Sequence, residues 1–154
     1  DLHCVMHSHE VNSQTLAASK SKLIPLTQEG CQLYERVGYH EFNGIVLNDE
    51  EKEKLINAIG NEKHTLLMRN HGLITAGPTA AWAFIRHQHF IRNAEVQLKL
   101  MASNAEMSII SDNILKHTRE QFEGGSAQAG AKVRHPEWPA FWRLLDSLDE
   151  KWKQ

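Results

Sequence analysis

Short strand-like runs alternate with helical stretches along the first two thirds of the chain, and this alternation limits the fold more than any other feature. Residues 2–8 and 65–69 are predicted to be strands, and residues 73–75 are predicted to form a third strand after an Asn-His-Gly turn. Residues 77–79 then open a long stretch in which apolar residues recur at helical spacing through Ala102. Strands interleaved with helices in one chain predict a layered α/β fold.

The other elements predicted from the sequence are one extended segment and several shorter helices. Asn48 is predicted to be a helix N-cap, with Glu51 three residues later, and Gly60 is predicted to end that helix. The remaining segments with helical character are 11–19, 26–36, 111–123 and 136–152, and residues 38–42 are predicted to be extended.

The last third of the chain has a different composition, and we divide the chain there. Residues 124–130 are rich in Gly, Ala and Ser, which is typical of a linker or a mobile loop. We therefore predict an α/β domain over 1–123, a loop or linker over 124–135 and a helical extension over 136–154. The aromatic residues of the extension are interpreted as a packing face for its own domain or a neighbouring subunit; they are Trp138, Phe141, Trp142 and Trp152.

Composition and charge describe an ordinary soluble globular chain. The net charge is −2 and the pI about 6.6, values that indicate neither a nucleic acid nor an anionic membrane as the partner. No apolar run approaches the length of a transmembrane helix. Cys4 and Cys31 are too few for a disulfide framework, so we expect a protein of the reducing cytoplasm.

Three histidines form the strongest functional signal in the chain. Residues i and i+2 of a strand point to the same side, so His7 and His9 can direct two imidazoles at one point. His71 lies in the turn between two predicted strands, and its imidazole completes the open three-ligand pattern of a catalytic zinc. The sequence therefore predicts a site for Zn²⁺ or another divalent metal at these three residues.

Chance is the alternative explanation for the His-x-His pair, because ten histidines in 154 residues produce some close pairs. His87 and His89 have the same spacing, but they lie in a segment with helical periodicity, where side chains at i and i+2 diverge. We interpret those two as surface histidines or as helix histidines with hydrogen-bond partners. The Asn-His-Gly turn at the end of a strand favours the metal site over chance.

Three motifs agree in order and spacing with a known family. They are CVMHSH at 4–9, GYHEFNGI at 38–45 and LMRNHGLIT at 67–75. Together they resemble the class II aldolase/adducin family, to which fuculose-phosphate aldolase and ribulose-phosphate 4-epimerase belong. The resemblance extends over residues 2–102, and residues 134–141 are similar to C-terminal extensions of some bacterial members. It implies an α/β/α arrangement with a mostly antiparallel central sheet.

The resemblance implies a zinc-dependent lyase of the aldolase type that cleaves a phosphorylated ketose through a metal-stabilised enediolate. A sugar-phosphate 4-epimerase of the same family would use the same ligands, so both activities stay open. The resemblance also implies a homo-oligomer, specifically a tetramer. Tyr39 matches a family tyrosine that reaches into the neighbouring subunit's site and assists proton transfer, and a half-buried strand aromatic is the alternative interpretation.

The family's phosphate-binding turns and its glutamate acid/base precede the His-x-His segment, whereas this chain begins six residues before His7. We therefore expect it to be the C-terminal part of the domain and to be weak or inactive alone. Two further possibilities are a non-catalytic interaction domain like the adducin head and a zinc-binding but inactive fragment. Glu10 is not expected to replace the glutamate, because strand alternation points it away from both histidines.

Overall fold

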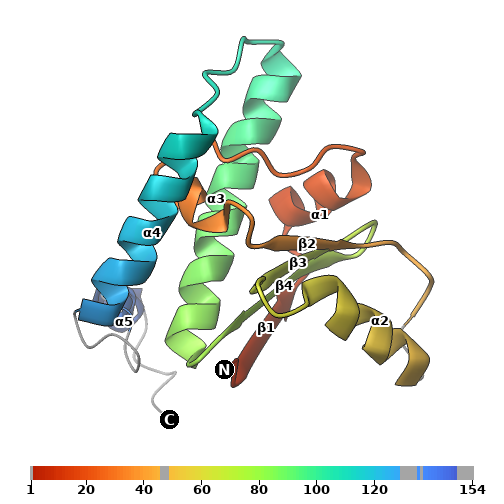
Figure 1. The fold of residues 1–154 in the computed structure, drawn as a ribbon, viewed down its shortest axis with the longest axis horizontal. Coiled ribbons are helices and arrows are strands. Elements are labelled where there is room, and N and C mark those ends of the chain that lie inside the picture. The colour runs from red at the N-terminus through yellow and green to blue at the C-terminus, as the bar shows by residue number, and fades with distance from the viewer. Residues whose placement is uncertain (1, 46–48, 129–134, 136, 149–154) are drawn as a thin grey trace.

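A four-stranded mixed sheet forms the centre of the molecule (Figure 1). The structure, a computed structural model, describes residues 2–45, 49–128, 135 and 137–148, with side chains in its fourth helix described up to Gly124. The strands lie in the order β1 (Cys4–Ser8), β4 (Gly72–Gly77), β3 (Thr65–Met68) and β2 (Val37–His40). β4 pairs antiparallel with both β1 and β3, whereas β2 runs parallel to β3. The mostly antiparallel sheet is confirmed.

Two helices, α1 (Val11–Ala18) and α3 (Ala80–Ser103), cover one face of the sheet. Leu67 and Leu73 lie directly opposite each other across β3 and β4, so both point to this face, where they are fully buried with Phe90. Burying each such side chain stabilises the fold by about 1.5–3 kcal/mol. This apolar layer therefore decides which strand residues face the helices and which face the other way.

On the opposite face, α2 (Asp49–Ile59) packs on β2 and β3 and completes three layers, α/β/α (Figure 1). A Cβ at Gly38 would collide with the carbonyl oxygen of Ala58, so only glycine lets α2 approach β2 this closely. The predicted layered α/β fold is confirmed. α2 leaves β1 uncovered on this face, where Val5 and His7 are exposed.

The helix predicted over 26–36 is wrong, because the segment forms only a 3-10 helix, η1 (Glu29–Leu33). Several backbone groups of the loop before it form hydrogen bonds with side chains of α3. The amide of Leu26 donates to Asn93 Oδ1 at 2.8 Å, and Asn93 Nδ2 donates to the carbonyl of Ile24 at 2.7 Å. A buried side-chain amide thus holds this loop extended, against the helical preference of the local sequence.

α4 (Asp112–Gln128) continues beyond its predicted end at residue 123 and into the predicted linker. Once a helix has begun, each further residue adds a hydrogen bond, and a glycine costs only about 1 kcal/mol relative to alanine, so Gly124 does not end it. Residues 129–134 and the predicted N-cap Asn48 lie outside the described residues. The domain division at 123/124 stays a prediction.

The last helix, α5 (Trp138–Leu148), packs its aromatic residues on α3. The rings of Trp138 and Phe141 lie 5.6 and 5.1 Å from the ring of Phe84. The predicted packing face is therefore confirmed for these two residues, whereas Trp152 lies outside the described residues. Among the described helices, none is both long and apolar enough to cross a membrane.

Candidate metal centre

The structure brings together the three histidines that the sequence singles out. One ring nitrogen each of His7, His9 and His71 lies within 4.8 Å of the other two. The centroids of the rings are 4.8 Å apart for His7 and His9, 5.1 Å for His7 and His71, and 4.8 Å for His9 and His71. Three imidazoles from two separate segments therefore face one another at the surface.

Strand alternation places the first two histidines as predicted. Ser8 points to the helix-covered face, where its Oγ lies 2.6 Å from Nε2 of His87 on α3. Its neighbours on either side, His7 and His9, consequently point to the opposite face, and both are exposed there. The packing of β1 against α3 thus fixes the direction of the two imidazoles.

A tight turn between β3 and β4 presents the third histidine. Asn70 adopts a left-handed conformation with φ 54°, and the amide of His71 donates to the carbonyl of Met68 at 3.1 Å. A Cβ at Gly72 would collide with the carbonyl oxygen of Ser8 and lie 2.9 Å from Cδ2 of His9. Only glycine at this position lets the turn approach β1, so the Asn-His-Gly sequence is what brings the third imidazole to the other two.

Hydrogen bonding fixes the proton on one of these rings. His7 Nδ1 lies 3.0 Å from the carbonyl oxygen of Leu73, which can only accept, so Nδ1 carries the proton and donates. The lone pair of His7 then sits on Nε2, 3.0 Å from Nε2 of His9. A backbone carbonyl that orients an imidazole in this way is the usual outer support of a metal-ligating histidine.

The third ring is held in its neutral form. Burial lowers the pKa of His71, and the nearby His7 and His9 lower the pKa further. Because a neutral imidazole is the form that ligates a metal, His71 is available as a ligand at neutral pH.

The donor set fits a divalent transition metal. Nitrogens that share a tetrahedral zinc at about 2.0–2.1 Å lie about 3.4 Å apart, so small side-chain rotations would close these three around an ion. His9 would shift its proton to Nδ1, with no change in charge. Three imidazoles on an open face leave a fourth position free for a water molecule or a substrate, which is the pattern of catalytic zinc.

Tyr39 is not brought to the three histidines of its own chain. It pairs with Leu67 across β2 and β3 and so points to the helix-covered face, opposite to His7. Its hydroxyl accepts a hydrogen bond from the amide of Leu23 at 3.0 Å, and burial raises the pKa of this hydroxyl. Within this chain Tyr39 is a half-buried aromatic residue of a strand. Its role in a neighbouring subunit's site stays a prediction.

Glu10 caps a helix, a role that the sequence reading did not assign. Its Oε2 accepts from the amide of Ser13 and its Oε1 from Nδ2 of Asn12, both at 3.0 Å. These bonds turn the chain from β1 into α1 directly after His9. The carboxylate is engaged in this cap.

A small hollow beside His71 contains polar residues that the sequence reading left without a role. It is lined from β2, α2 and the β3–β4 turn, and its charged or titratable residues include His40, Glu41, Glu51 and Arg69. His40 Nε2 lies 3.5 Å from Oε2 of Glu51. Residues of the GYHEF and RNHG motifs both line this hollow. The presence of both motifs in one sequence is therefore the signal that could have identified these residues.

Comparison with known proteins gives the family. Residues 1–98 match the family model of the class II aldolase and adducin N-terminal domain. The chain is 30% identical over its full length to an aldolase class 2 protein of Pseudomonas aeruginosa and 34% identical over 95% of its length to one of Caulobacter vibrioides. It covers 59% and 55% of those proteins, so it spans little more than half their length. Alpha-adducin of Rattus norvegicus is 28% identical over 96% of the chain and 21% of that protein.

Solved structures with a similar fold come from the same family. An aldolase II superfamily protein from Pseudomonas syringae matches with a TM-score of 0.77 and 26% identity, over 96% of this chain and 55% of that one. L-fuculose 1-phosphate aldolase from Glaciozyma antarctica matches with a TM-score of 0.68 and 21% identity, over 79% of this chain and 45% of that one, which shows a shared fold. From the family match, the relatives and the fold together, this chain belongs to the class II aldolase/adducin family.

Proposed function

We propose that this chain is the metal-binding part of a zinc-dependent lyase that cleaves a phosphorylated ketose, with His7, His9 and His71 as the ligands. The observation that carries the proposal is the convergence of three imidazole nitrogens on an open face of the sheet. The L-fuculose 1-phosphate aldolase among the matching structures supports a sugar phosphate as the substrate class.

The chain's own residues have defined tasks in this proposal. A zinc ion bound here would supply Lewis acidity to an oxygen of the substrate, which favours carbon–carbon cleavage. The carbonyl of Leu73 holds His7 in the tautomer that ligates through Nε2. Gly72 keeps the His71 turn against β1, and the exposed sides of His7 and His9 leave room for a substrate to approach.

We further propose a cytoplasmic homotetramer in which Tyr39 acts across a subunit boundary. The Tyr39 hydroxyl accepts from the Leu23 amide and keeps its own proton free to donate. Arg69, 5.1 Å above the Tyr39 ring, comes from the same turn as His71. A symmetric assembly is the arrangement in which one subunit can complete the pocket of the next. Light scattering of the complete gene product tests the tetramer, and a monomer would remove Tyr39 from the site.

Two other functions of the family remain as alternatives. An epimerase would use the same three ligands and would convert one sugar phosphate into its stereoisomer without cleavage. An adducin-like interaction domain is favoured by the similarity to alpha-adducin over nearly the whole chain. A domain with no catalytic role has no need of three converging imidazoles, which is why we prefer the lyase.

The test is a metal titration followed by an activity assay. Isothermal titration of the 154-residue chain with zinc should show one site per chain, and absence of binding would overturn the proposal. The complete gene product should release dihydroxyacetone phosphate from L-fuculose 1-phosphate, and a chelator should abolish the release. Stereoisomer formation without cleavage would identify the epimerase, and zinc binding with neither reaction would exclude both activities on this substrate.

A further inference from the structure

The end of the sheet opposite to the metal centre contains a second polar site. Arg36 precedes β2, His64 precedes β3 and Ala76 lies near the end of β4, so their backbones meet at this end, away from the His71 turn. An open cleft of about 670 Å³ lies here. Its charged and titratable lining residues are Arg36, Glu62, Lys63, His64, Arg86 and Glu123. We refer to it as the basic cleft, and its volume is in the range of small-molecule sites.

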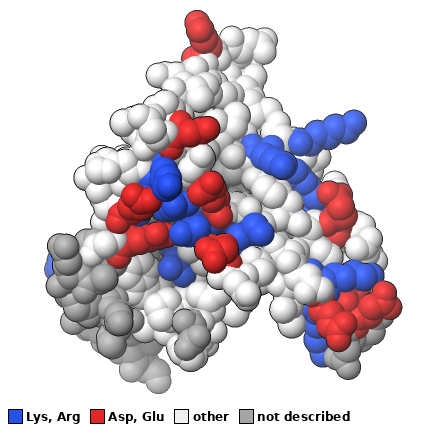
Figure 2. Space-filling model, viewed as in Figure 1, with Lys and Arg blue, Asp and Glu red and all other residues white. Residues whose placement is uncertain are grey.

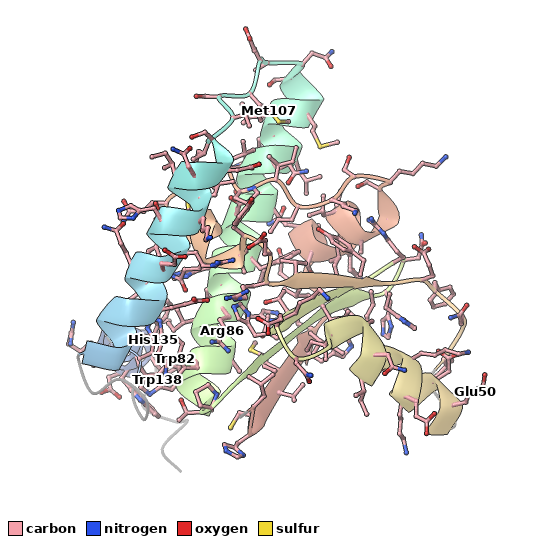
Figure 3. All side chains as sticks on the ribbon, in the orientation of Figure 1. Glu50, Trp82, Arg86, Met107, His135 and Trp138 are labelled. Atoms are coloured by element: carbon pink, nitrogen blue, oxygen red, sulfur yellow. The ribbon has the colours of Figure 1, made fainter. Side chains whose placement is uncertain are left out.

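Arg86 is the central residue of the basic cleft. Figure 3 shows it beside α3, on the side of the helix toward the strands. Its Nη1 donates to the carbonyl of Ala76, and its guanidinium carbon lies 5.2 Å from the centroid of the Trp82 ring. Its Nε is buried without a hydrogen-bond partner, and no carboxylate of the described residues forms an ion pair with it. A mostly buried guanidinium with unused donors is costly unless an anion pairs with it.

The neighbouring carboxylates do not supply the anion that Arg86 lacks. Acidic and basic side chains are mixed between α4 and the sheet (Figure 2), but Glu123 already accepts from Arg36 Nε at 2.9 Å. Burial lowers the pKa of Arg86 to about 10, although the nearby Glu123 raises this pKa and Arg36 lowers it to a smaller extent. Burial, Arg86 and Arg36 together hold the pKa of His64 well below its ordinary value. The site therefore presents fixed positive charge beside a neutral imidazole.

We propose that the basic cleft binds the oxyanion of a small metabolite, a phosphate or a carboxylate, through Arg86 and Lys63. A guanidinium presents its donors in a planar fork that matches two oxygens of such an anion. Lys63, a lining residue of the cleft, adds positive charge. Neutral His64 adds a hydrogen-bonding group and does not repel the neighbouring guanidiniums. The two sites use opposite ends of the sheet, so this proposal does not depend on the metal centre.

The test uses the ¹⁵N-labelled 154-residue chain with a chelator present and ionic strength held constant with chloride. Inorganic phosphate and malonate are titrated separately, and amide shifts are followed in TROSY spectra. Saturable shifts are expected in residues 60–64 and around Arg86, and the tighter of the two anions identifies the ligand as phosphate or carboxylate. Shifts confined to the His71 turn, or shifts that do not saturate with either anion, would overturn the proposal.

Variants sharpen the same measurement. Arg86→Met keeps the aliphatic packing and removes the charge, and Lys63→Met does so at the rim of the cleft; each should weaken binding at least five-fold. Lys99→Met is the matched control, because Lys99 lies on α3 but is 73% exposed and paired with Glu95. If Arg86→Met does not fold, Lys63→Met decides. Unchanged affinity in a folded charge-removing variant would overturn the proposal, as would equal weakening in Lys99→Met.

Discussion

The two ends of the central sheet place titratable groups under opposite conditions. At the metal centre three imidazoles face one another near solvent, and their lone pairs can converge without a large cost of burial. At the basic cleft one imidazole is kept neutral, because burial and, to a smaller extent, the guanidiniums of Arg86 and Arg36 lower its pKa. Converging lone pairs bind a cation, whereas converging N–H donors bind an anion. The same sheet can therefore present two sites of opposite preference.

The largest expected effect is on zinc affinity, which should depend on one end of the central sheet and not on the other. His71→Ala removes one of three ligands and should weaken zinc binding by at least about 100-fold, since loss of an outer support alone costs about 10–100-fold. Arg86→Met should leave zinc affinity unchanged, because it acts at the other end of the sheet. His117→Ala, an exposed histidine on α4, is the control. Calorimetry measures all three, and tight zinc binding by folded His71→Ala would remove His71 from the ligand set.

The second prediction concerns pH. Ligating imidazoles must be unprotonated, and an ordinary imidazole titrates near about 6.5, so zinc affinity should fall about ten-fold or more from pH 7.5 to 5.5. Arg86 keeps its charge throughout, since its pKa is lowered only to about 10. Sulfate, which stays dianionic at both values, should therefore bind the basic cleft equally. Equal zinc affinity at the two pH values would count against histidine ligation.

The third prediction tests the glycine that joins the turn to β1. Gly72→Ala places a methyl group against the carbonyl of Ser8, a backbone atom that moves only with its strand, and should destabilise the fold by about 1–3 kcal/mol. Zinc binding should weaken as well, because the His71 turn is pushed away. Gly124→Ala is the matched control: nothing lies within 4 Å of its added Cβ, and it should stabilise α4 by about 0.5–1 kcal/mol. Urea unfolding measures both, and an unaffected Gly72→Ala would show that the turn adapts.

Local patterns predict the convergence of the three histidines well, because the geometry that brings them together is mostly local. His7 and His9 need only a strand, and the Asn-His-Gly turn supplies the rest. The basic cleft has no such pattern, because Arg36, His64 and Arg86 meet only when two strand starts and a helix pack together. The loop before η1 was missed for the same reason: Asn93, far away in the sequence, decides its conformation. Sequence periodicity predicts elements and layers, whereas tertiary hydrogen bonds decide which helical stretches form.

The smallest predicted effect is the pH dependence of stability at the basic cleft. Because the pKa of folded His64 lies below the value near about 6.5 of an unfolded histidine, the unfolded state binds more protons as pH falls through 6.5. The free energy of unfolding should therefore decrease from pH 7.5 to 5.0, and His64→Gln should make that decrease smaller. Part of it should remain, since burial also lowers the pKa of His87 and His135 to about 4. Urea unfolding at both pH values, with exposed His117→Gln as the control, measures the difference. If His64→Gln keeps the full pH dependence of the original chain, then burial, Arg86 and Arg36 do not lower the pKa of folded His64, and the neutral imidazole assigned to the basic cleft is wrong.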